Sequence, residues 1–450
     1  MKKHSINVGI YAPYDLNSFN LNKDDETNKL LQKIYSTNNY LDLSNLNDKS
    51  KYNILLINSN LSKENNLENF ELIYKIDNEN NNYKLSTGRF IGELNINNIN
   101  LSINSGYSDI FERRLLNYSN DIYLSSDKYD SNNENNKLRL VLEYLYLSSL
   151  RKSLALGFPK YYQEVSKNDF NIKGNININK YLSNIKNNYK GIPYTHKELI
   201  VDKIILSVLY KAYSLCNSDL ITNEFIDIKR YFNEFNCNDL LKNFRIDYLN
   251  KSKQSKSLNN NIYLSYKKVL NYATVIIKNK LSLTINNDKS IASGWLIDIS
   301  ELFELYLYKL IKNNFKDYIV LYQEEIPIYN SLFISRKFIP DIVMKKDNDV
   351  IILDAKFKKM DYNKLDVDRS DLQQIHTYYT YYKSLGYNVK FSTLIYPIRV
   401  EKDIKLISNI FDNNINNDLF GISYILVGNT MNEQIKNENL FIERLRKVIE

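Results

Sequence analysis

The feature that most constrains the fold of this chain is a pair of apolar runs within residues 338–359. The runs read FIPDIVMKK and DVIILDAKF, and Asp347, Asn348 and Asp349 lie where the first gives way to the second. Short β-prone runs joined by Asp and Asn are typical of two antiparallel strands connected by a tight turn. The sequence therefore predicts a β-hairpin at this position.

Polar side chains interrupt both strands of the predicted hairpin. Because side chains two residues apart in a strand share one face, Asp354 and Lys356 are expected to point the same way. Leu353 and Ala355 then point to the opposite face. Asp341 lies on the partner strand, and the twist of neighbouring strands can bring its carboxylate beside Asp354. The sequence thus predicts two carboxylates and a lysine close together.

The carboxylates of Asp341 and Asp354 would repel each other in a partly buried site unless a cation lay between them. Mg²⁺ suits such a pair, because it binds through one or two carboxylates together with water and phosphate oxygens. Lys356 would then face the attacking water or the scissile phosphate and stabilise the developing charge. The alternative is an Asp-x-Lys on a solvated strand face. The apolar runs on both sides of the motif favour a phosphodiester-cleaving site.

Composition limits the classes of protein to which the chain can belong. It has 450 residues, of which 43% are hydrophobic and 25% charged, which is the balance of a globular protein with two or three domains. No apolar run approaches the ~20 residues needed to span a bilayer. The first residues, MKKHSINVGIYAPYD, lack the apolar core of a signal peptide. We therefore expect no membrane association and a cytoplasmic location.

Metal sites built from Cys and His are not expected. The cysteines, Cys216 and Cys237, lack CxxC spacing. The histidines, His4, His196 and His376, are scattered along the chain. This pattern argues against structural zinc and against disulfide bonds.

The positive charge of the chain is concentrated upstream. The formal net charge is +8, but residues 291–450 contain 21 Lys and Arg against 22 Asp and Glu. Residues 1–290 contain 39 basic and 30 acidic residues. If the partner is nucleic acid, most of the electrostatic attraction must come from the upstream part or from another subunit.

The pattern of apolar residues predicts three domains. Residues 1–130 are rich in short β-like runs, and the alternation in GRFIGELNINNINLSI predicts a hairpin or small barrel. Residues 131–285 are expected to form a mainly helical connecting region. Residues 286–450 read as helix, three strands, helix and further strands, which is an α/β order around a mixed central sheet flanked by helices. The predicted class is α/β, with α+β character over the whole chain.

Six segments have apolar residues at helical spacing. They are residues 137–157, 196–216, 238–249, 265–279, 295–315 and 370–386. Their apolar stripes are expected to pack in the core rather than to bind a ligand.

The predicted site resembles the signature of the PD-(D/E)xK nuclease superfamily, with Asp341, Asp354 and Lys356 at the signature positions. Glu304 stands at the place of the acidic residue on that superfamily's first helix. The resemblance implies a restriction-endonuclease-like domain in which these four residues are catalytic. In it Asp341, Asp354 and Glu304 would bind the metal. Glu301, one turn earlier, is a competing choice for the helix acid.

The segment SDLQQIHTY resembles the Gln-x-x-x-Tyr element of the same superfamily, through Gln374 and Tyr378. These two side chains, one helical turn apart, could contact the DNA backbone or orient Lys356. The alternative is a polar helix edge packed on the sheet. Lys358 is a further candidate for contact with the substrate phosphate.

The remaining polar residues near the motif have weaker claims to a role. Lys359 and Lys364 could also contact phosphate, although exposed lysines need no such explanation. Asp371 is expected to be a helix acid favoured by the helix dipole, and His376 a bystander, because the reaction needs no histidine base. Trp295 is expected in the core.

Within the superfamily the chain most resembles McrC, the nuclease subunit of McrBC modification-dependent restriction systems. The resemblance rests on LIDISELFELYLYKLI, IPDIVM, ILDAKFK and RSDLQQIHTYYTY. It extends more weakly to GRFIGELNINNINLSI, to YYQEVSKNDFNIKGNININKYL and to IPYTHKELIVDKIILSVLYKAY. Asn177 stands where an Asp is expected before a helix, and residues 1–80 show little of the pattern.

The resemblance to McrC implies a Mg²⁺-dependent endonuclease subunit, with Mn²⁺ as a substitute, in a GTP-dependent restriction complex that cleaves modified double-stranded DNA. It implies a hexameric AAA+ GTPase of the McrB type as partner, which the N-terminal domain would contact and this chain would stimulate. The sequence contains no GxxxxGK[ST] loop, so the chain itself is not expected to bind nucleotide. Two alternatives stay open, a nuclease of another defence or repair system and a non-catalytic assembly subunit.

Overall fold

A computed structural model describes most of the chain as a mixed α/β protein. The described residues are 5–10, 25–48, 51–57, 71–120, 134–217, 221–222, 225–281, 291–330, 335–358, 368–399 and 420–449. They form two compact units, one made of residues 1–137 with 289–450 and the other of residues 138–288. The division into three domains stays a prediction. No helix of the described part is long and apolar enough to cross a membrane.

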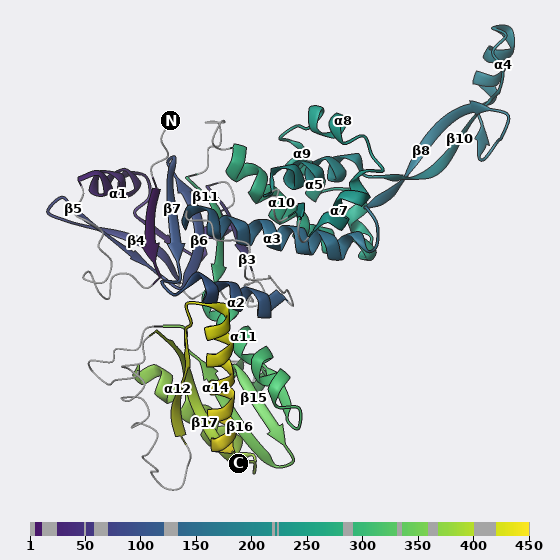
Figure 1. The fold of residues 1–450 in the computed structure, drawn as a ribbon. Helices are drawn as coiled ribbons and strands as arrows, with labels where there is room; N and C mark the ends of the chain where they lie inside the picture. Colours follow the sequence, from purple (N-terminus) through teal and green to yellow (C-terminus); the bar gives the residue numbers. More distant parts are fainter. Residues whose placement is uncertain are drawn as a thin grey trace. The chain divides into compact units, whose positions relative to one another are not determined.

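The first unit contains a five-stranded sheet with strands from distant parts of the sequence (Figure 1). In order across the sheet they are β1 (Ser5–Gly9), β7 (Ile99–Asn104), β6 (Phe90–Ile96), β11 (Ala292–Asp298) and β3 (Tyr52–Ile57). β11 pairs antiparallel with β6 and parallel with β3. A Cβ atom at Gly294 would lie 2.0 Å from Glu93 O, so glycine permits the close approach of β11 to β6. A strand from the last third of the chain is therefore part of the N-terminal sheet.

A second, smaller sheet and three helical segments complete the N-terminal part. They are β2 (Tyr40–Asp42), β4 (Leu72–Glu79), β5 (Asn82–Thr87), α1 (Asp25–Thr37), η1 (Ser44–Asn47) and α2 (Asp109–Asn120). The predicted hairpin of β6 and β7 is confirmed by their antiparallel pairing. Its turn uses Asn97 and Asn98, both with positive φ, a conformation that Asn tolerates better than most residues.

The helix predicted over residues 295–315 begins later than expected. Residues 295–298 belong to β11, and the helix that follows is α11 (Ile299–Asn314). Asp298 is its N-cap and accepts a hydrogen bond from the backbone N–H of Ser300 at 3.0 Å. The prediction was wrong over four residues because pairing with β6 and β3 decides their conformation. Trp295 is fully buried, which confirms its predicted place in the core.

The second large sheet of this unit is mixed. In order across the sheet its strands are β12 (Ile319–Tyr322), β15 (Ile342–Lys346), β16 (Asp349–Ala355), β17 (Asn388–Ile398) and β18 (Phe420–Leu426). β15 is antiparallel to both β12 and β16, whereas β17 is parallel to β16 and β18. The predicted hairpin is confirmed, since Lys346 pairs with Asp349 across a two-residue turn in which Asp347 has positive φ.

Three helices pack against this mixed sheet, namely α11, α12 (Arg369–Ser384) and α14 (Met431–Ile449). Between β12 and β15 the chain forms a separate two-stranded ribbon of β13 (Ile326–Asn330) and β14 (Ser335–Phe338). Val350 and Ile352 of β16 share one core with α12, and the alternate residues Ile351 and Leu353 are buried as well. Both faces of β16 are therefore covered, as its continuous apolar run requires.

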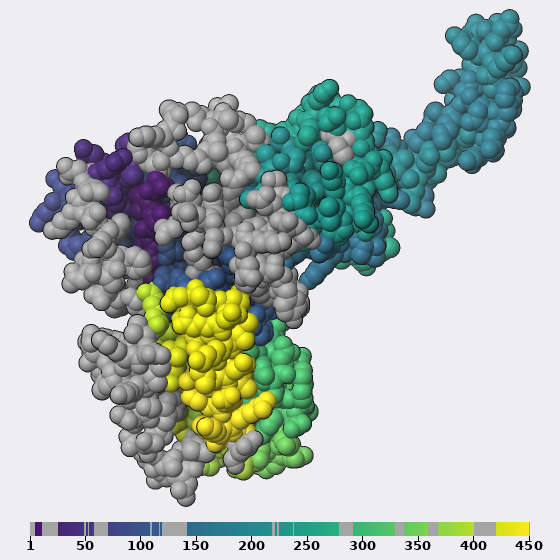
Figure 2. Space-filling model, viewed as in Figure 1, coloured from purple at the N-terminus to yellow at the C-terminus, as the bar shows by residue number. Residues whose placement is uncertain are grey.

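The second unit combines a helical body with a projecting arm, which Figures 1 and 2 show in teal. The body contains α3 (Glu134–Leu154), α5 (Lys203–Leu215), α7 (Ile226–Phe232), α8 (Cys237–Lys242), α9 (Tyr248–Lys253), η3 (Lys256–Asn259), η4 (Asn261–Tyr263) and α10 (Ser265–Leu281). The arm contains β8 (Lys160–Asp169), β9 (Asn175–Ile176), α4 (Ile178–Lys186) and β10 (Ile192–Val201). Its two long strands pair along ten residues each.

The helix predicted over residues 196–216 is wrong in its first part. Residues 196–201 end β10, and α5 begins only after Asp202, whose Oδ1 accepts from the backbone N–H of Ile204 at 3.1 Å. Pairing with β8 and this N-cap together decide where the helix starts. Asn177 is likewise an N-cap, since its Oδ1 accepts from the backbone N–H of Lys180 at 3.0 Å.

Candidate active site

The end of β16 positions the aspartate and the lysine of the predicted motif. Asp354 is 0% exposed, and Lys356 follows the strand directly. The backbone N–H of Lys356 donates to Ile395 O on β17 at 2.8 Å, which continues the pairing beyond the last strand residue. Lys356 Nζ lies 2.6 Å from Asp354 Oδ2. Leu353 and Ala355 are buried on the opposite face.

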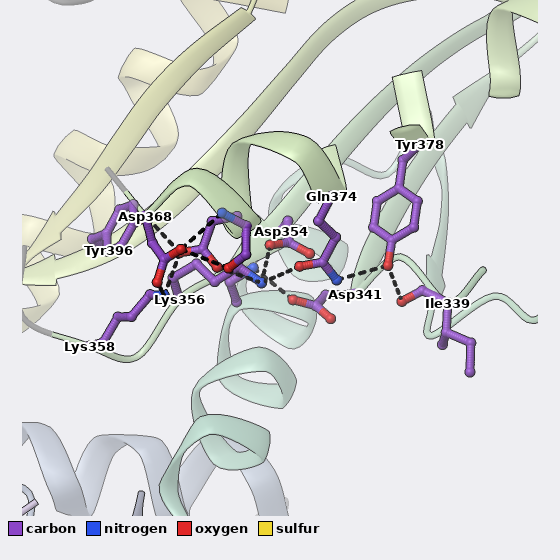
Figure 3. Close-up of polar contacts among 12 residues, drawn as sticks. Ile339, Asp341, Asp354, Lys356, Lys358, Asp368, Gln374, Tyr378 and Tyr396 are labelled. Carbon is purple, nitrogen blue, oxygen red and sulfur yellow. Dashed lines mark hydrogen bonds and ion pairs between the residues drawn. The ribbon is translucent and has the colours of Figure 1, made fainter. Parts of the chain in front are cut away.

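Asp341 lies in the bend immediately before β15. Its Oδ2 accepts a hydrogen bond from the backbone N–H of Ala355 at 2.8 Å, so its side chain reaches across to β16. Figure 3 shows the carboxylates of Asp341 and Asp354 near the side chain of Lys356. The hairpin therefore brings these three residues together.

The electrostatics of the cluster favour an added positive charge. Burial raises the pKa of Asp341 well above its ordinary value, and the charges of Glu304 and Asp354 raise it further. Burial also raises the pKa of Asp354, against the effect of Lys356. Burial alone would lower the pKa of Lys356, but the two aspartates raise it above its ordinary value. One ammonium group therefore faces several carboxylates that are hard to ionise together.

Glu304 on α11 is the helix acid that acts on these carboxylates. Burial raises the pKa of Glu304 to about 8, against the effect of a hydrogen bond from Gln323. Of the neighbouring charges, that of Glu304 raises the pKa of Asp341 most. This influence favours Glu304 over Glu301, which lies in the first turn of the same helix.

Gln374 and Tyr378 form a hydrogen-bonded chain that leads away from the lysine. Lys356 Nζ donates to Gln374 Oε1 at 2.9 Å, and Gln374 Nε2 donates to the Tyr378 hydroxyl at 2.9 Å. That hydroxyl donates in turn to Ile339 O at 3.2 Å (Figure 3). Since both ends of the Gln374 amide are engaged, its oxygen is held toward Lys356. Gln374 is therefore in direct contact with the lysine, and the role of the pair stays a prediction.

Asp371 has a more central position than the sequence suggested. It is almost fully buried in the first turn of α12, where Oδ2 lies 2.6 Å from Lys358 Nζ and Oδ1 lies 3.9 Å from Lys356 Nζ. Lys358 Nζ also lies 3.3 Å from Asp368 Oδ2, and the Tyr396 hydroxyl donates to Asp371 Oδ2 at 3.3 Å. Two carboxylates therefore engage Lys358, the predicted phosphate contact. An acid in the first turn of the helix that follows a Lys-x-Lys is the sequence signal that could have identified Asp371.

The other predicted residues lie away from this cluster or outside the described part. The exposed ring of His376 stacks on Phe420, with 4.7 Å between ring centroids. Lys359 and Lys364 lie outside the described residues. His376 therefore has a packing contact of its own.

The carboxylate oxygens of the cluster determine which metal ion it could hold. In the described ranges, no group of three or more His, Cys, Asp and Glu could hold a metal by itself. Mg²⁺ needs only one or two carboxylates, which Asp341 and Asp354 supply, and water can connect it to a third such as Glu304. Asp354 Oδ2 is paired with Lys356, whereas the buried Asp354 Oδ1 and the buried Tyr322 hydroxyl have no hydrogen-bond partner among the described residues. These two atoms fit a hydrated cation better than a zinc-type cluster.

Of the solved structures that match, one supports the fold. A chain from a structure of Thermococcus gammatolerans McrB AAA+ hexamers with bound McrC matches with a TM-score of 0.53 and 14% identity, over 99% of this chain and 100% of that chain. A chain from the cryo-EM structure of the T. gammatolerans McrBC complex matches with a TM-score of 0.31 and 13% identity, over 69% of this chain and 88% of that chain.

No curated protein gives a significant match. The family model described as the McrBC 5-methylcytosine restriction system component matches residues 85–397, which is more than half of the chain. That span includes the β6–β7 hairpin, the whole second unit and the cluster at the end of β16. The chain therefore belongs to the family of McrBC 5-methylcytosine restriction system components.

Proposed function

We propose that this chain is a Mg²⁺-dependent DNA endonuclease subunit of a GTP-dependent restriction complex that cleaves modified double-stranded DNA. The observation that carries the proposal is the cluster of Asp341, Asp354 and Lys356, in which Lys356 Nζ lies 2.6 Å from a completely buried carboxylate. Membership of a restriction-system family supports it. The mixed sheet with its β15–β16 hairpin supports a PD-(D/E)xK, restriction-endonuclease-like architecture for this part.

The residues of the cluster divide the work of hydrolysis. A bound Mg²⁺ would supply a water of lowered pKa and would neutralise charge on the phosphate. Asp341 and Asp354 would hold this ion, and Glu304 would hold one of its waters. Lys356 keeps its proton between carboxylates, so it offers N–H donors to the phosphate oxygens as negative charge develops. Gln374 limits the rotation of the ammonium group by accepting one of its hydrogen bonds.

We infer that the chain works with a hexameric AAA+ GTPase and stimulates its GTPase activity. The matched T. gammatolerans structure contains McrB AAA+ hexamers with bound McrC. Residues 1–130 are the predicted docking region. The arm is a second candidate surface, because Phe170 is 75% exposed, Tyr162 70% and Tyr189 67%. Apolar side chains gathered on a projecting element mark a contact with another protein.

The first test is to mix the chain with its AAA+ partner, GTP, Mg²⁺ and either methylated or unmethylated DNA. We expect cleavage of the methylated DNA only, and replacement of Mg²⁺ by Mn²⁺ should preserve it. Asp354→Asn should reduce cleavage by at least about 100-fold, since it removes a proposed metal ligand. The same variant should retain partner binding and GTPase stimulation, because the change is confined to the end of β16.

His376→Ala is the matched control, because His376 is exposed on α12 and stacks only on Phe420 among the ring contacts of the described residues. It should cleave at the wild-type rate. Undiminished cleavage by Asp354→Asn would overturn the site. Absence of cleavage by the wild-type complex with every divalent ion would overturn the endonuclease function and favour the assembly subunit.

A further inference from the structure

Gln323 directly follows β12 and hydrogen-bonds to two of the elements that carry the cluster. Its side-chain Nε2 donates to Glu304 Oε2 on α11 at 3.0 Å. Its backbone N–H donates to Asp341 O, in the bend before β15, at 2.9 Å. One residue therefore connects the helix acid to the hairpin aspartate. Neither contact is suggested by the sequence motifs.

The backbone of Gln323 is in an unfavourable conformation. Its φ is +48°, in the left-handed region, which a residue with a Cβ adopts only at a cost. The other non-glycine residues with positive φ in the described part are all Asn or Asp, namely Asn80, Asn81, Asn97, Asn98, Asn188 and Asp347. Asn and Asp tolerate this region, because their short polar side chains bond locally. Gln has a longer side chain, which is less suited to such a local bond.

A strained conformation of this kind persists where the surroundings enforce it, and it is concentrated at functional sites. Glycine or Asn would adopt the same φ more easily, but glycine has no side chain and Asn is one methylene shorter. From this backbone position the Gln323 amide reaches Glu304 Oε2 at 3.0 Å. The strain and the contact thus have one explanation, the placing of an amide donor beside Glu304.

A neutral amide suits this place better than a charged donor. Glu304 lies among the charges of Asp298, Asp354 and Glu301. The neutral N–H donor of Gln323 fixes Glu304 Oε2 and leaves the charge of the carboxylate in place. A lysine at this position would neutralise that charge. Glu304 Oε1 then stays available to a water of a bound cation. Residues that orient the groups around a metal in this way affect its affinity strongly.

We propose that Gln323 is a positioning residue for the metal site, which it serves by holding Glu304 through its amide and the Asp341 bend through its backbone. The inference rests on the proposed Mg²⁺-dependent function. It predicts that the length and the donor of Gln323 are needed for metal affinity, although the residue destabilises its own backbone.

Two substitutions separate the contact from the strain. Gln323→Met keeps the length and the left-handed cost but removes the donor. Gln323→Gly removes both the donor and the cost of the left-handed conformation. Mn²⁺ affinity is measured on the full chain without DNA, by electron paramagnetic resonance of free Mn²⁺. Both variants should bind Mn²⁺ about 10-fold more weakly than wild type. Without metal, Gln323→Gly should melt at a higher temperature than Gln323→Met.

The Mg²⁺ dependence of cleavage gives a second measurement. The Mg²⁺ concentration for half-maximal rate should rise about 10-fold in both variants, while the rate at saturating Mg²⁺ changes less. Glu325→Gln is the matched control. Glu325 is exposed two residues away, and its carboxylate pairs with Lys337 at 2.6 Å. It should leave the Mn²⁺ affinity unchanged.

A double-mutant cycle tests whether Gln323 acts through Glu304. In the Glu304→Gln background, Gln323→Met should weaken Mn²⁺ binding by no more than about 2-fold, since the partner is already altered. An undiminished 10-fold loss in that background would overturn the assignment. Wild-type Mn²⁺ affinity in Gln323→Met would also overturn it while leaving the proposed function intact. A wild-type chain that binds no Mn²⁺ would overturn both.

Discussion

The end of β16 and the tip of the arm depart from the ordinary rules of burial in opposite directions. The cluster in the first unit buries Asp354 completely and most of Asp371. The arm of the second unit leaves Phe170 and Tyr189 exposed to solvent at 75% and 67%. A buried acid costs free energy of folding, whereas an exposed aromatic side chain gains nothing from folding. Under the proposed function, a bound partner would compensate for each of these departures.

The missing component differs between the two regions. The carboxylates need positive charge, which Lys356 provides only in part, because the pKa values of Asp341 and Asp354 stay raised despite its ammonium group. The arm needs apolar area, which its own two-stranded pairing cannot provide. The charge distribution thus supports the proposed cation and phosphate substrate at one region. Apolar exposure indicates a protein at the other.

Removal of the lysine should have the largest effect on the cluster. Lys356→Ala leaves the carboxylates without their ammonium group and the phosphate without an N–H donor. We expect cleavage to fall about 100- to 1,000-fold in single-turnover assays with the partner and GTP. Lys383→Ala, on the exposed side of α12, should cleave as wild type does. Equal cleavage rates for the two variants would show that Lys356 contributes no more to cleavage than an exposed lysine does.

Polar substitutions at the arm should act on assembly alone. Phe170→Ser with Tyr189→Ser should weaken binding of the AAA+ partner about 30-fold in calorimetric titrations, as expected for aromatic anchors. The melting temperature of the free chain should not change, because both side chains are exposed. Leu209→Ala, fully buried in the same unit, should instead destabilise the free chain by about 2–5 kcal/mol. A lower melting temperature in the serine double variant would show that the arm packs on its own fold.

The last prediction is a dependence of stability on pH at the cluster. The pKa of Glu304 is raised to about 8, above its value near 4.3 in an unfolded chain. The folded state therefore binds this proton more tightly, and its contribution to stability is full below about pH 4.3 and is lost as pH rises through about 8. In EDTA the melting temperature should fall over this window. In Glu304→Gln the melting temperature should fall less steeply with pH than in wild type. Parallel curves for the two proteins would contradict the burial of the Glu304 charge.

Much of the candidate site could be predicted because its pattern is local. The apolar runs with Asp347 and Asn348 between them predict the hairpin, and period-two alternation places Asp354 and Lys356 on one face. The spacing of Gln374 and Tyr378 along a helix places them next to each other, and Gln374 accepts a hydrogen bond from Lys356. Each of these predictions depends on residues a few positions apart.

The errors and omissions arise where distant segments meet. Residues 295–298 have helical spacing, yet they pair with β6 and β3. Residues 196–201 likewise pair with β8. Gln323 is 19 positions from Glu304 and 18 from Asp341, and it belongs to no motif. Its role became visible only through a hydrogen bond and a positive φ.

The sequence by itself determined the hairpin, the motif that it carries and the side chains that share its face, because turn chemistry and strand alternation act between near neighbours. Tertiary structure decided how Glu304, Asp371 and Gln323 lie around the hairpin residues and where β11 pairs. Burial, strain and charge coupling arise only when segments remote in sequence are packed together, so they leave no local pattern to read.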